Sequence, residues 1–455
     1  MNHLNQHGQP HVFLEPCSTY DINHLRSVLA RWAPIFRASI TKADTVVIKP
    51  NWLTHTHKYI KGEWQSVITH PNLITSLLEV VLQCLQGSGS VLIADAPQTN
   101  SRWDEIMKIM QPETWIKMGR SAGVDVKVLD LRLDEWVTRG DLIIYREKRP
   151  GDPLGSTTCN LRENSEFLNH KPSKRGYFGA DYNKEETNMA HSNGNHKYKV
   201  SRSILASTVF INVPKLKTHK KAGITCSLKN LVGINTYKNY LPHYNEGTPQ
   251  DGGDQFPEST TRTKTETILL AQFNSLLSRY PKIAKTLIPL KTLGKALFGH
   301  TRNTIRSGSW YGNDTLWRTV LDLNKILLYA NPDGTLRPPN QNQHKRYISL
   351  VDAIISGEGN GPEAPTPKNS ALLILGTNPV SVDCVCAKIM GFDYRRIPSI
   401  RNAFLVRRYP ICEFSYDHIT VHSSDMRFNK RLTQILQTDC FNFQPHFGWK
   451  GHIEL

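Results

Sequence analysis

The sequence predicts an α/β fold, in which a mostly parallel sheet is flanked by helices and interrupted by long polar insertions. Four short β-rich runs carry this prediction: TVVIKPN, SVLIADAP, STVFINVPK and ALLILGTNP, which end at Asn51, Pro97, Lys215 and Pro379. Each run is continuously apolar, which is typical of strands buried on both faces. Helical stretches lie between the runs, so a parallel sheet is the economical interpretation.

Two of the predicted helices have clear ends. PNLITSLLEVVLQCLQG begins beside Pro71 and stops near Gly87, and SVDCVCAKIMG can be capped by Ser381 and ended by Gly391. Between residues 267 and 299, the sequence predicts two or three basic amphipathic helices. We expect these helices to pack on the sheet or to cover the lid. Binding to a membrane surface is the alternative.

The chain divides into five segments by composition. An N-terminal α/β half spans 1–150, and a C-terminal α/β half with a tail spans 336–455. Between them we expect a polar insertion at 151–200, a third strand with a basic loop and a second insertion at 201–265, and a basic helical segment at 266–335. Such long polar insertions are either functional lids or disordered segments.

Charge and cysteine usage restrict the class of partner. The 56 basic and 39 acidic residues give a net charge of +17, which favours an anionic partner, unless scattered lysines only maintain solubility. Nucleic acid is disfavoured, because the basic residues form no recognisable binding module with aromatics. The eight cysteines contain no C-x-x-C pair, unlike zinc or iron–sulfur sites. We expect a cytoplasmic protein, since neither a secretory signal nor a membrane-length apolar run occurs.

A basic stretch follows directly from the third predicted strand. KLKTHKKAGITCSLKNLVG, residues 215–233, holds five lysines and one histidine. Its Lys215, Lys217, His219 and Asn230 predict an anion cradle, and a solvated basic turn is the alternative. Lys229 lies within an apolar context, which would lower its pKa and suit a base or a Schiff-base amine, unless its ammonium reaches solvent.

Polar residues also follow the other predicted strands. Lys49 and Asn51 end the first, Asp95 ends the second, and Asn378 ends the last. Ligands of parallel α/β sheets bind at the carboxyl ends of the strands, so these positions predict one site. We assign proton transfer there to Lys229, Lys49 or Asp95 and anion binding to Asn51.

A glycine-rich loop and a histidine group complete the candidates. In VDAIISGEGNGPEAP, Gly357, Gly359 and Gly361 could present amides to an anion, or could form a plain tight loop. His55, His57 and His70 follow the first strand and could ligate a metal together with Asp95, although their spacing is not specific. The sequence predicts neither a particular metal or cofactor nor an oligomeric state.

Three segments resemble the family called domain of unknown function 362. They are VVIKPN, FINVPKLKTHKKAGITCSLKNLVGIN, and VDAIISGEGNGP followed by NPVSVDCVCAKIMGFD, within residues 44–394. The resemblance implies a cytoplasmic prokaryotic protein. It carries over to Lys49, Pro50, Asn51, Pro214, Lys215, Lys217, His219, Lys229, Asn230, Gly233, Asp352, Gly359, Gly361, Pro362 and Asp383. Some members carry cysteine runs for iron–sulfur clusters, which this chain lacks, and its insertions resemble a branch associated with surface polysaccharide.

We therefore expect a protein that holds an anionic small molecule, phosphorylated or carboxylated, at the strand ends. Chemical transformation of that molecule is one hypothesis. A non-catalytic binding protein for an anionic polymer and a metal-dependent enzyme are the alternatives. The sequence leaves open whether the chain is an enzyme.

Overall fold

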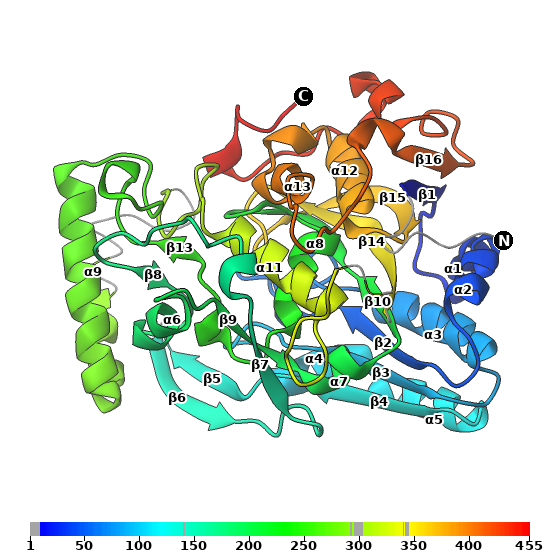
Figure 1. Ribbon diagram of the computed structural model, residues 1–455, viewed down its shortest axis with the longest axis horizontal. Helices are drawn as coiled ribbons and strands as arrows, with labels where there is room; N and C mark the ends of the chain where they lie inside the picture. The colour runs from blue at the N-terminus through cyan, green and yellow to red at the C-terminus, as the bar shows by residue number, and fades with distance from the viewer. Residues whose placement is uncertain (1–9, 140–141, 292–293, 295–303, 340, 342–344) are drawn as a thin grey trace.

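The computed structural model describes residues 10–139, 142–291, 294, 304–339, 341 and 345–455. Ten strands form its main sheet, eight of them in the order β16-β1-β15-β14-β10-β2-β3-β4 (Figure 1). Their bounds are β1 His11–Pro16, β2 Thr45–Pro50, β3 Ser90–Asp95, β4 Asp125–Asp130, β10 Val209–Val213, β14 Arg346–Glu358, β15 Thr366–Gly376 and β16 Thr420–Ser423. The hairpin β11 (Lys215–His219) and β12 (Gly223–Thr225) joins the sheet through β14.

The sheet is mostly parallel, as the sequence predicts. β4, β3, β2, β10 and β14 pair in parallel along the sheet. β15 runs antiparallel to both β14 and β1, and β12 runs antiparallel to β11. The carboxyl end of β15 therefore lies at the opposite edge of the sheet from those of β2, β3 and β10. The prediction that Asn378 joins their site is wrong for this reason.

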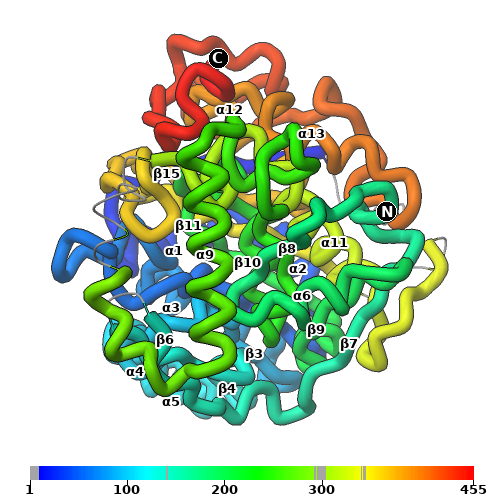
Figure 2. The backbone as a smooth tube through the Cα atoms, turned by 90° about the vertical axis from the view of Figure 1, so that its left-hand side faces the viewer, coloured from blue at the N-terminus to red at the C-terminus, as the bar shows by residue number. Residues whose placement is uncertain are grey.

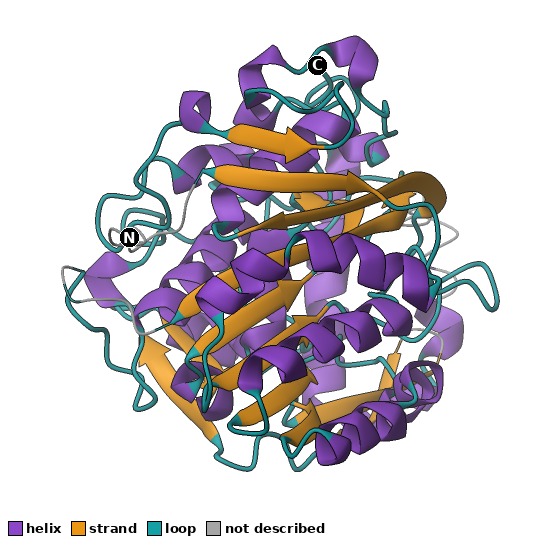
Figure 3. Cartoon of the chain, turned by 90° about the vertical axis from the view of Figure 1, so that its right-hand side faces the viewer, coloured by secondary structure: helices purple, strands orange, loops and turns teal. Residues whose placement is uncertain are grey.

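Helices cover both faces of the sheet, which explains the continuously apolar strands. Val46 and Ile48 pack on one face with α1 (Ile22–Arg31), α2 (Ala33–Ser39), α3 (Pro71–Leu85), α4 (Trp103–Met110) and α5 (Pro112–Ser121). Val47, between them, packs on the other face with α11 (Leu316–Tyr329). Figure 3 shows helices lying against the twisted sheet. The core thus buries successive residues of each central strand on alternate faces.

The predicted helix ends are confirmed at three of four positions. α3 begins at Pro71 and ends at Leu85, two residues before Gly87. α12 (Pro379–Met390) ends at Gly391, whose φ of 89° is the left-handed geometry that glycine adopts readily. Its N-cap, however, is Asn378, not Ser381. The Asn378 side chain accepts hydrogen bonds from the amides of Val380 and Ser381, so Pro379 and Ser381 lie inside the helix.

The polar insertions contain defined elements of secondary structure. The first holds β7 (Ser156–Asn160), β8 (Tyr177–Phe178), α6 (Glu185–Ala190) and β9 (Lys197–Ser201). The second contributes β13 (Tyr244–Asn245), which pairs with β8. A further hairpin, β5 (Asp134–Arg139) with β6 (Leu142–Lys148), lies before them in the chain. The disordered alternative does not apply to these described elements.

The basic helical region divides into two unlike parts. α9 (Thr261–Arg279) lies at one end of the molecule, and Figure 2 shows it running along that end. By contrast, α11 is buried along most of its length in the core. The predicted helical stretch beyond Lys291 falls largely outside the described residues. Within the described part of the chain, no helix combines the length and the apolar composition needed to cross a membrane.

The Asn378 cap gives a test of this account of α12. Replacing Asn378 with Ala removes the acceptor for two amides and the donor to the Ile411 carbonyl. We expect the free energy of unfolding to fall by about 0.5–2 kcal/mol in denaturant titrations. Asn378→Asp keeps the acceptor and should retain more stability. An Asn378→Ala variant as stable as the parent protein would contradict the assignment of the cap.

Candidate functional site

The basic stretch folds into a buried hairpin that leads into a short helix. β11 pairs with β14 on one side and with β12 on the other. α8 (Ser227–Asn230) follows and carries Lys229 and Asn230. All five residues of β11 are buried, so this stretch is not a solvated loop. The hairpin instead brings Lys217 and His219 to the carboxyl ends of β2 and β3.

A cavity of about 450 Å³ lies at these strand ends. Sequence reasoning placed seven of its lining residues in one site: Lys49, Asn51, Asp95, Lys217, His219, Lys229 and Asn230. Its basic lining residues are Lys49, Lys217, Lys220, Lys221, Lys229, Lys238 and Arg306, and its acidic ones are Asp95 and Glu363. The described lining therefore carries seven basic side chains of lysine and arginine against two carboxylates.

Both carboxylates already have cationic partners. The Lys49 Nζ lies 2.8 Å from Asp95 Oδ1, and both side chains are almost completely buried. Asp95 Oδ2 accepts a hydrogen bond from the Trp52 amide. Glu363 accepts from the Gln98 amide group and lies 3.4 Å from the Lys220 Nζ, which together hold its pKa at about 2. Neither carboxylate thus neutralises the remaining lysines.

Gly233 is required beside the Lys49–Asp95 pair. A Cβ atom at this position would lie 1.9 Å from Asp95 Oδ1 and 2.6 Å from Lys49 Nζ. The Gly233 carbonyl meanwhile accepts a hydrogen bond from the Ala96 amide, which fixes the approach. Any larger residue would force the ion pair apart.

Lys217 is a buried cation without a carboxylate partner among the described residues. Its Nζ donates to the Val67 carbonyl and lies 3.4 Å from Asn51 Oδ1. Burial first, and then the charges of Lys215 and Lys229, lower the pKa of Lys217 well below the ordinary lysine value. A charge buried in this way costs stability unless a counter-ion is supplied.

His219 is held in one tautomer when neutral. Its Nδ1 accepts hydrogen bonds from the amides of Lys221 and Ala222. The ring proton must therefore be on Nε2, so the side chain is a donor toward the cavity that it lines. Burial and the neighbouring lysines lower the pKa of His219 well below its usual range, which favours this neutral form.

Lys229 lies on α8, whose position is fixed by a buried aspartate. Asp383 of α12 accepts hydrogen bonds from the amides of Ser227 and Leu228, the first two residues of α8. Burial raises the pKa of Asp383 to about 7. Burial and the charge of Lys49 lower the pKa of Lys229 to about 8. Asp383 therefore fixes the position of α8, and with it that of Lys229.

Lys215 lies outside the cavity. Its Nζ is 2.7 Å from Asp352 Oδ2, and both side chains are fully buried. The Tyr20 hydroxyl donates to the other oxygen of Asp352 and accepts from Lys215. A register shift in the β11–β14 pairing separates Lys215 from Lys217, which would share a face in a regular strand. Lys215 therefore does not join Lys217, His219 and Asn230 in the predicted anion-binding site.

The three glycines of the glycine-rich loop support the hairpin, and they do not line the cavity. The amides of Gly359 and Gly361 donate to the carbonyls of Gln444 and Gly359. Carbonyls of the loop accept from the Thr218 hydroxyl and the Lys220 amide. Gly357 pairs with Lys217 in the β-ladder. The two amides are consequently already used within the protein, and Gly357, Gly359 and Gly361 are not among the lining residues.

The three histidines after β2 have separate structural roles. His55 Nδ1 accepts from the Arg102 amide. His57 Nδ1 accepts from the amides of Tyr59 and Ile60, and His70 caps α3 and stacks on Tyr20. Among the residues that the structure describes, no group of three or more histidine, cysteine and acidic side chains could hold a metal ion.

Several lining residues were missed by sequence reasoning. Lys238 donates to the carbonyls of Ala96, Val232 and Asn235, and burial lowers its pKa to about 7. His243 enters from the second polar insertion, and Arg306 from the basic segment that follows it. The only sequence signal for Lys238 is its place shortly after the apolar LVGIN.

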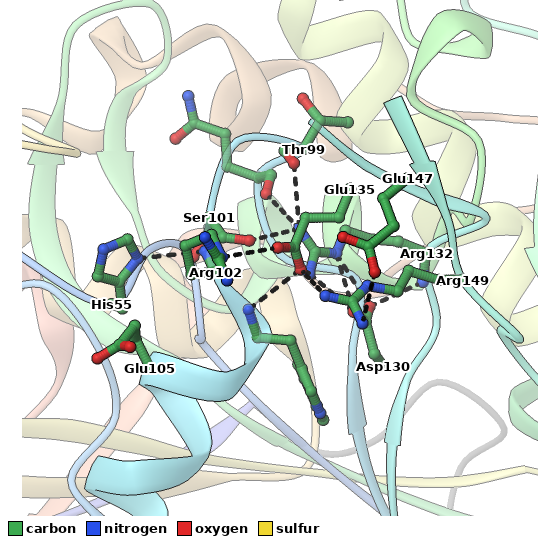
Figure 4. A network of polar contacts seen from close by, with 12 residues as sticks. His55, Thr99, Ser101, Arg102, Glu105, Asp130, Arg132, Glu135, Glu147 and Arg149 are labelled. Carbon is green, nitrogen blue, oxygen red and sulfur yellow. Dashed lines mark hydrogen bonds and ion pairs between the residues drawn. The ribbon is translucent and has the colours of Figure 1, made fainter. Parts of the chain in front are cut away.

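A buried arginine organises another wall of the cavity (Figure 4). Arg132 donates to the carbonyls of Gln98, Thr99 and Ser101, and it pairs with the carboxylates of Asp130 and Glu135. Gln98 and Thr99 line the cavity. Arg102 and Arg149 also pair with Glu135, which is fully buried. This network gives the loop after β3 a fixed shape without adding free charge to the cavity.

The contrast between Lys217 and Lys215 is testable. Lys217→Met removes a buried charge that has no carboxylate, and we expect the unliganded protein to gain on the order of 1–3 kcal/mol in the free energy of unfolding. Lys215→Met leaves Asp352 buried without its partner and should cost about 3–5 kcal/mol. In denaturant titrations, the free energy of unfolding should therefore rise in Lys217→Met and fall in Lys215→Met. Destabilisation by both would contradict the described electrostatics of Lys217.

Comparisons with known proteins give a family and distant structural likenesses. The family model described as Domain of unknown function (DUF362) matches residues 174–388. No curated protein matches. Similar solved structures include a Thermotoga maritima protein, at 12% identity and TM-score 0.31, covering 81% of this chain and 58% of that one. Another is lactate racemase apoprotein from Thermoanaerobacterium thermosaccharolyticum, at 10% identity and TM-score 0.31. That match covers 86% of this chain and 59% of the racemase chain.

The chain thus spans less than two thirds of the length of both of these solved proteins. The family match covers the hairpin β11–β12, α8 and most of α12, and hence the Lys217, His219 and Lys229 part of the cavity. The family model thus supports the family assignment expected from the sequence, over residues 174–388.

Proposed function

We propose that the cavity binds a small molecule with a phosphate or carboxylate group and that the protein is an enzyme acting on that molecule. The observation that carries the proposal is the charge of the lining. Of the seven lysine and arginine side chains, Lys49 and Lys220 are paired with the two lining carboxylates and Arg306 with Glu266, which leaves four lysines without a carboxylate partner among the described residues. An anionic ligand would supply the missing counter-charge.

The size and shape of the site favour a small molecule over a polymer. About 450 Å³ falls within the usual range of small-molecule pockets. The cationic groups converge on a concave site, and Lys217 is completely buried. A polymer would instead be expected to contact an extended basic surface. We therefore do not propose binding of an anionic polymer, and the experiments below distinguish it from binding of a small molecule.

The lining supplies separate groups for binding and for proton transfer. Lys217 and the Nε2 of His219 bind the anionic group, with Lys221 beside them. The Lys49–Asp95 pair and Lys229 supply proton donors and acceptors. The lowered pKa of Lys229, about 8, supports this role because part of its population is unprotonated near neutral pH. Metal-dependent chemistry would need ligands other than the histidine group predicted from sequence.

Native mass spectrometry of protein purified from its own host tests the proposal. We expect a co-purifying phosphorylated or carboxylated small molecule in the parent protein. The bound mass should be lost in Lys217→Met, because the substitution removes a buried cation of the cavity. Lys174→Met is a matched control that removes one exposed lysine outside the cavity lining. The control should keep the ligand.

Metal analysis of the same sample separates the alternatives. A protein that purifies empty, and that binds heparin with a steep salt dependence, would contradict the small-molecule proposal and favour a polymer-binding protein. A ligand retained in Lys217→Met would contradict the assignment of the binding site. A stoichiometric metal would favour the metal-dependent alternative.

A further inference from the structure

We propose that Lys229 forms an imine with the ligand, which is a small carbonyl compound bearing a carboxylate or phosphate close to the carbonyl group. This inference rests on the proposed function and names the substrate class of the same cavity. It follows from the contacts of the cavity lysines, the surroundings of Lys229 and the position of the anion-binding groups.

Among the cavity lysines, Lys229 differs in its contacts. The Nζ of Lys49 is paired with Asp95, that of Lys220 with Glu363, and that of Lys238 with three carbonyls. Lys217 donates to the Val67 carbonyl, and Lys221 lies over the Tyr244 ring, 4.7 Å from its centre. Within the described residues, no hydrogen bond or ion pair involves the Lys229 Nζ. Its amine lines the cavity without a protein partner, so a ligand can reach it.

The surroundings of Lys229 favour the free amine, which is the form that attacks a carbonyl. Lys229 is partly buried, and Lys49 lies close enough for its charge to lower the Lys229 pKa. A lysine beside a second cationic group and shielded from water is a recognised arrangement for imine formation. The Lys49 ammonium cannot take over this role, because it is held by Asp95, the Pro50 carbonyl and Asn230.

The neighbouring donors select an anionic carbonyl compound. Lys217, His219 and Lys221 line the same cavity as Lys229, and burial together with lysine charges that include Lys229 lowers the pKa values of all three. Lys217 and Lys221 supply positive charge, and His219 supplies an Nε2–H donor. A carboxylate or phosphate bound by these groups would hold an adjacent carbonyl carbon near the Lys229 Nζ.

The reaction is balanced without a further reactant. The unprotonated Lys229 nitrogen attacks the carbonyl carbon, and the C=O π electrons move to oxygen. Proton transfers through water in the cavity give a carbinolamine. The C–O bond then breaks, and the oxygen leaves as water. Starting from the ammonium, the nitrogen loses two protons, which depart in that water, and keeps one in the protonated imine.

Borohydride trapping tests the imine directly. The full-length protein is incubated with pyruvate, 2-oxoglutarate or glycolaldehyde phosphate, reduced with sodium borohydride, and mapped by peptide mass spectrometry. We expect one reduced adduct, on Lys229, with at least one of these probes. Acetone, a neutral carbonyl compound, should label Lys229 much less. The trapping rate should rise with pH and level off above about pH 8, the pKa of Lys229.

Three variants control the trapping experiment. The adduct should be absent in Lys229→Met and in Lys229→Arg, which keeps the positive charge, and present in Lys174→Met. No adduct on Lys229 with any probe, or labelling spread equally over exposed lysines, would overturn the imine. If the protein nevertheless holds an anionic ligand in native mass spectrometry, the proposed binding function survives. Failure of both experiments would remove both proposals.

Discussion

The ion pair between Lys49 and Asp95 joins the carboxyl ends of β2 and β3 at the base of the cavity. A buried pair stabilises a protein only when further hydrogen bonds satisfy its remaining atoms. Here the Pro50 carbonyl and Asn230 accept from Lys49, and the Trp52 amide donates to Asp95. Because Asp95 is paired with Lys49, its charge only partly offsets the lowering of the pKa values of Lys217 and Lys229. The cationic character of the cavity depends on this arrangement.

Other parts of the fold hold the repelling lysines in place. Asp383 of α12 fixes α8, which packs against it, and Arg132 fixes the loop after β3. Lys238 is held by carbonyls, and Lys217 by the Val67 carbonyl. The protein thus maintains a cluster of desolvated cations with neutral acceptors and distant aspartates. This arrangement costs stability in the empty state and favours binding of a negatively charged ligand.

Part of this site is readable from the sequence, because it lies where parallel strands end. The positions of polar residues just after the predicted strands were enough to place five of them together: Lys49, Asn51, Asp95, Lys217 and His219. The separation of Lys215 from Lys217 could not be predicted, because it depends on a register shift in the β11–β14 ladder. The prediction for Asn378 was wrong because an apolar run does not reveal the direction of β15 in the sheet. His243, in the second insertion, and Arg306, in the basic segment after it, reach the cavity through tertiary packing, for which their local sequence carries no pattern.

Four cavity lysines, Lys217, Lys221, Lys229 and Lys238, have no carboxylate partner among the described residues, and we expect a bound anion to supply their counter-charge. Calorimetric titration with sulfate or malonate at pH 8, in two buffers of different ionisation enthalpy, measures the protons exchanged on binding. An anion raises the pKa of a nearby lysine. Because the pKa of unliganded Lys229 is about 8 and that of Lys221 about 7, we expect net proton uptake, reduced in Lys229→Met. Binding without proton uptake, or with proton release, would contradict the account.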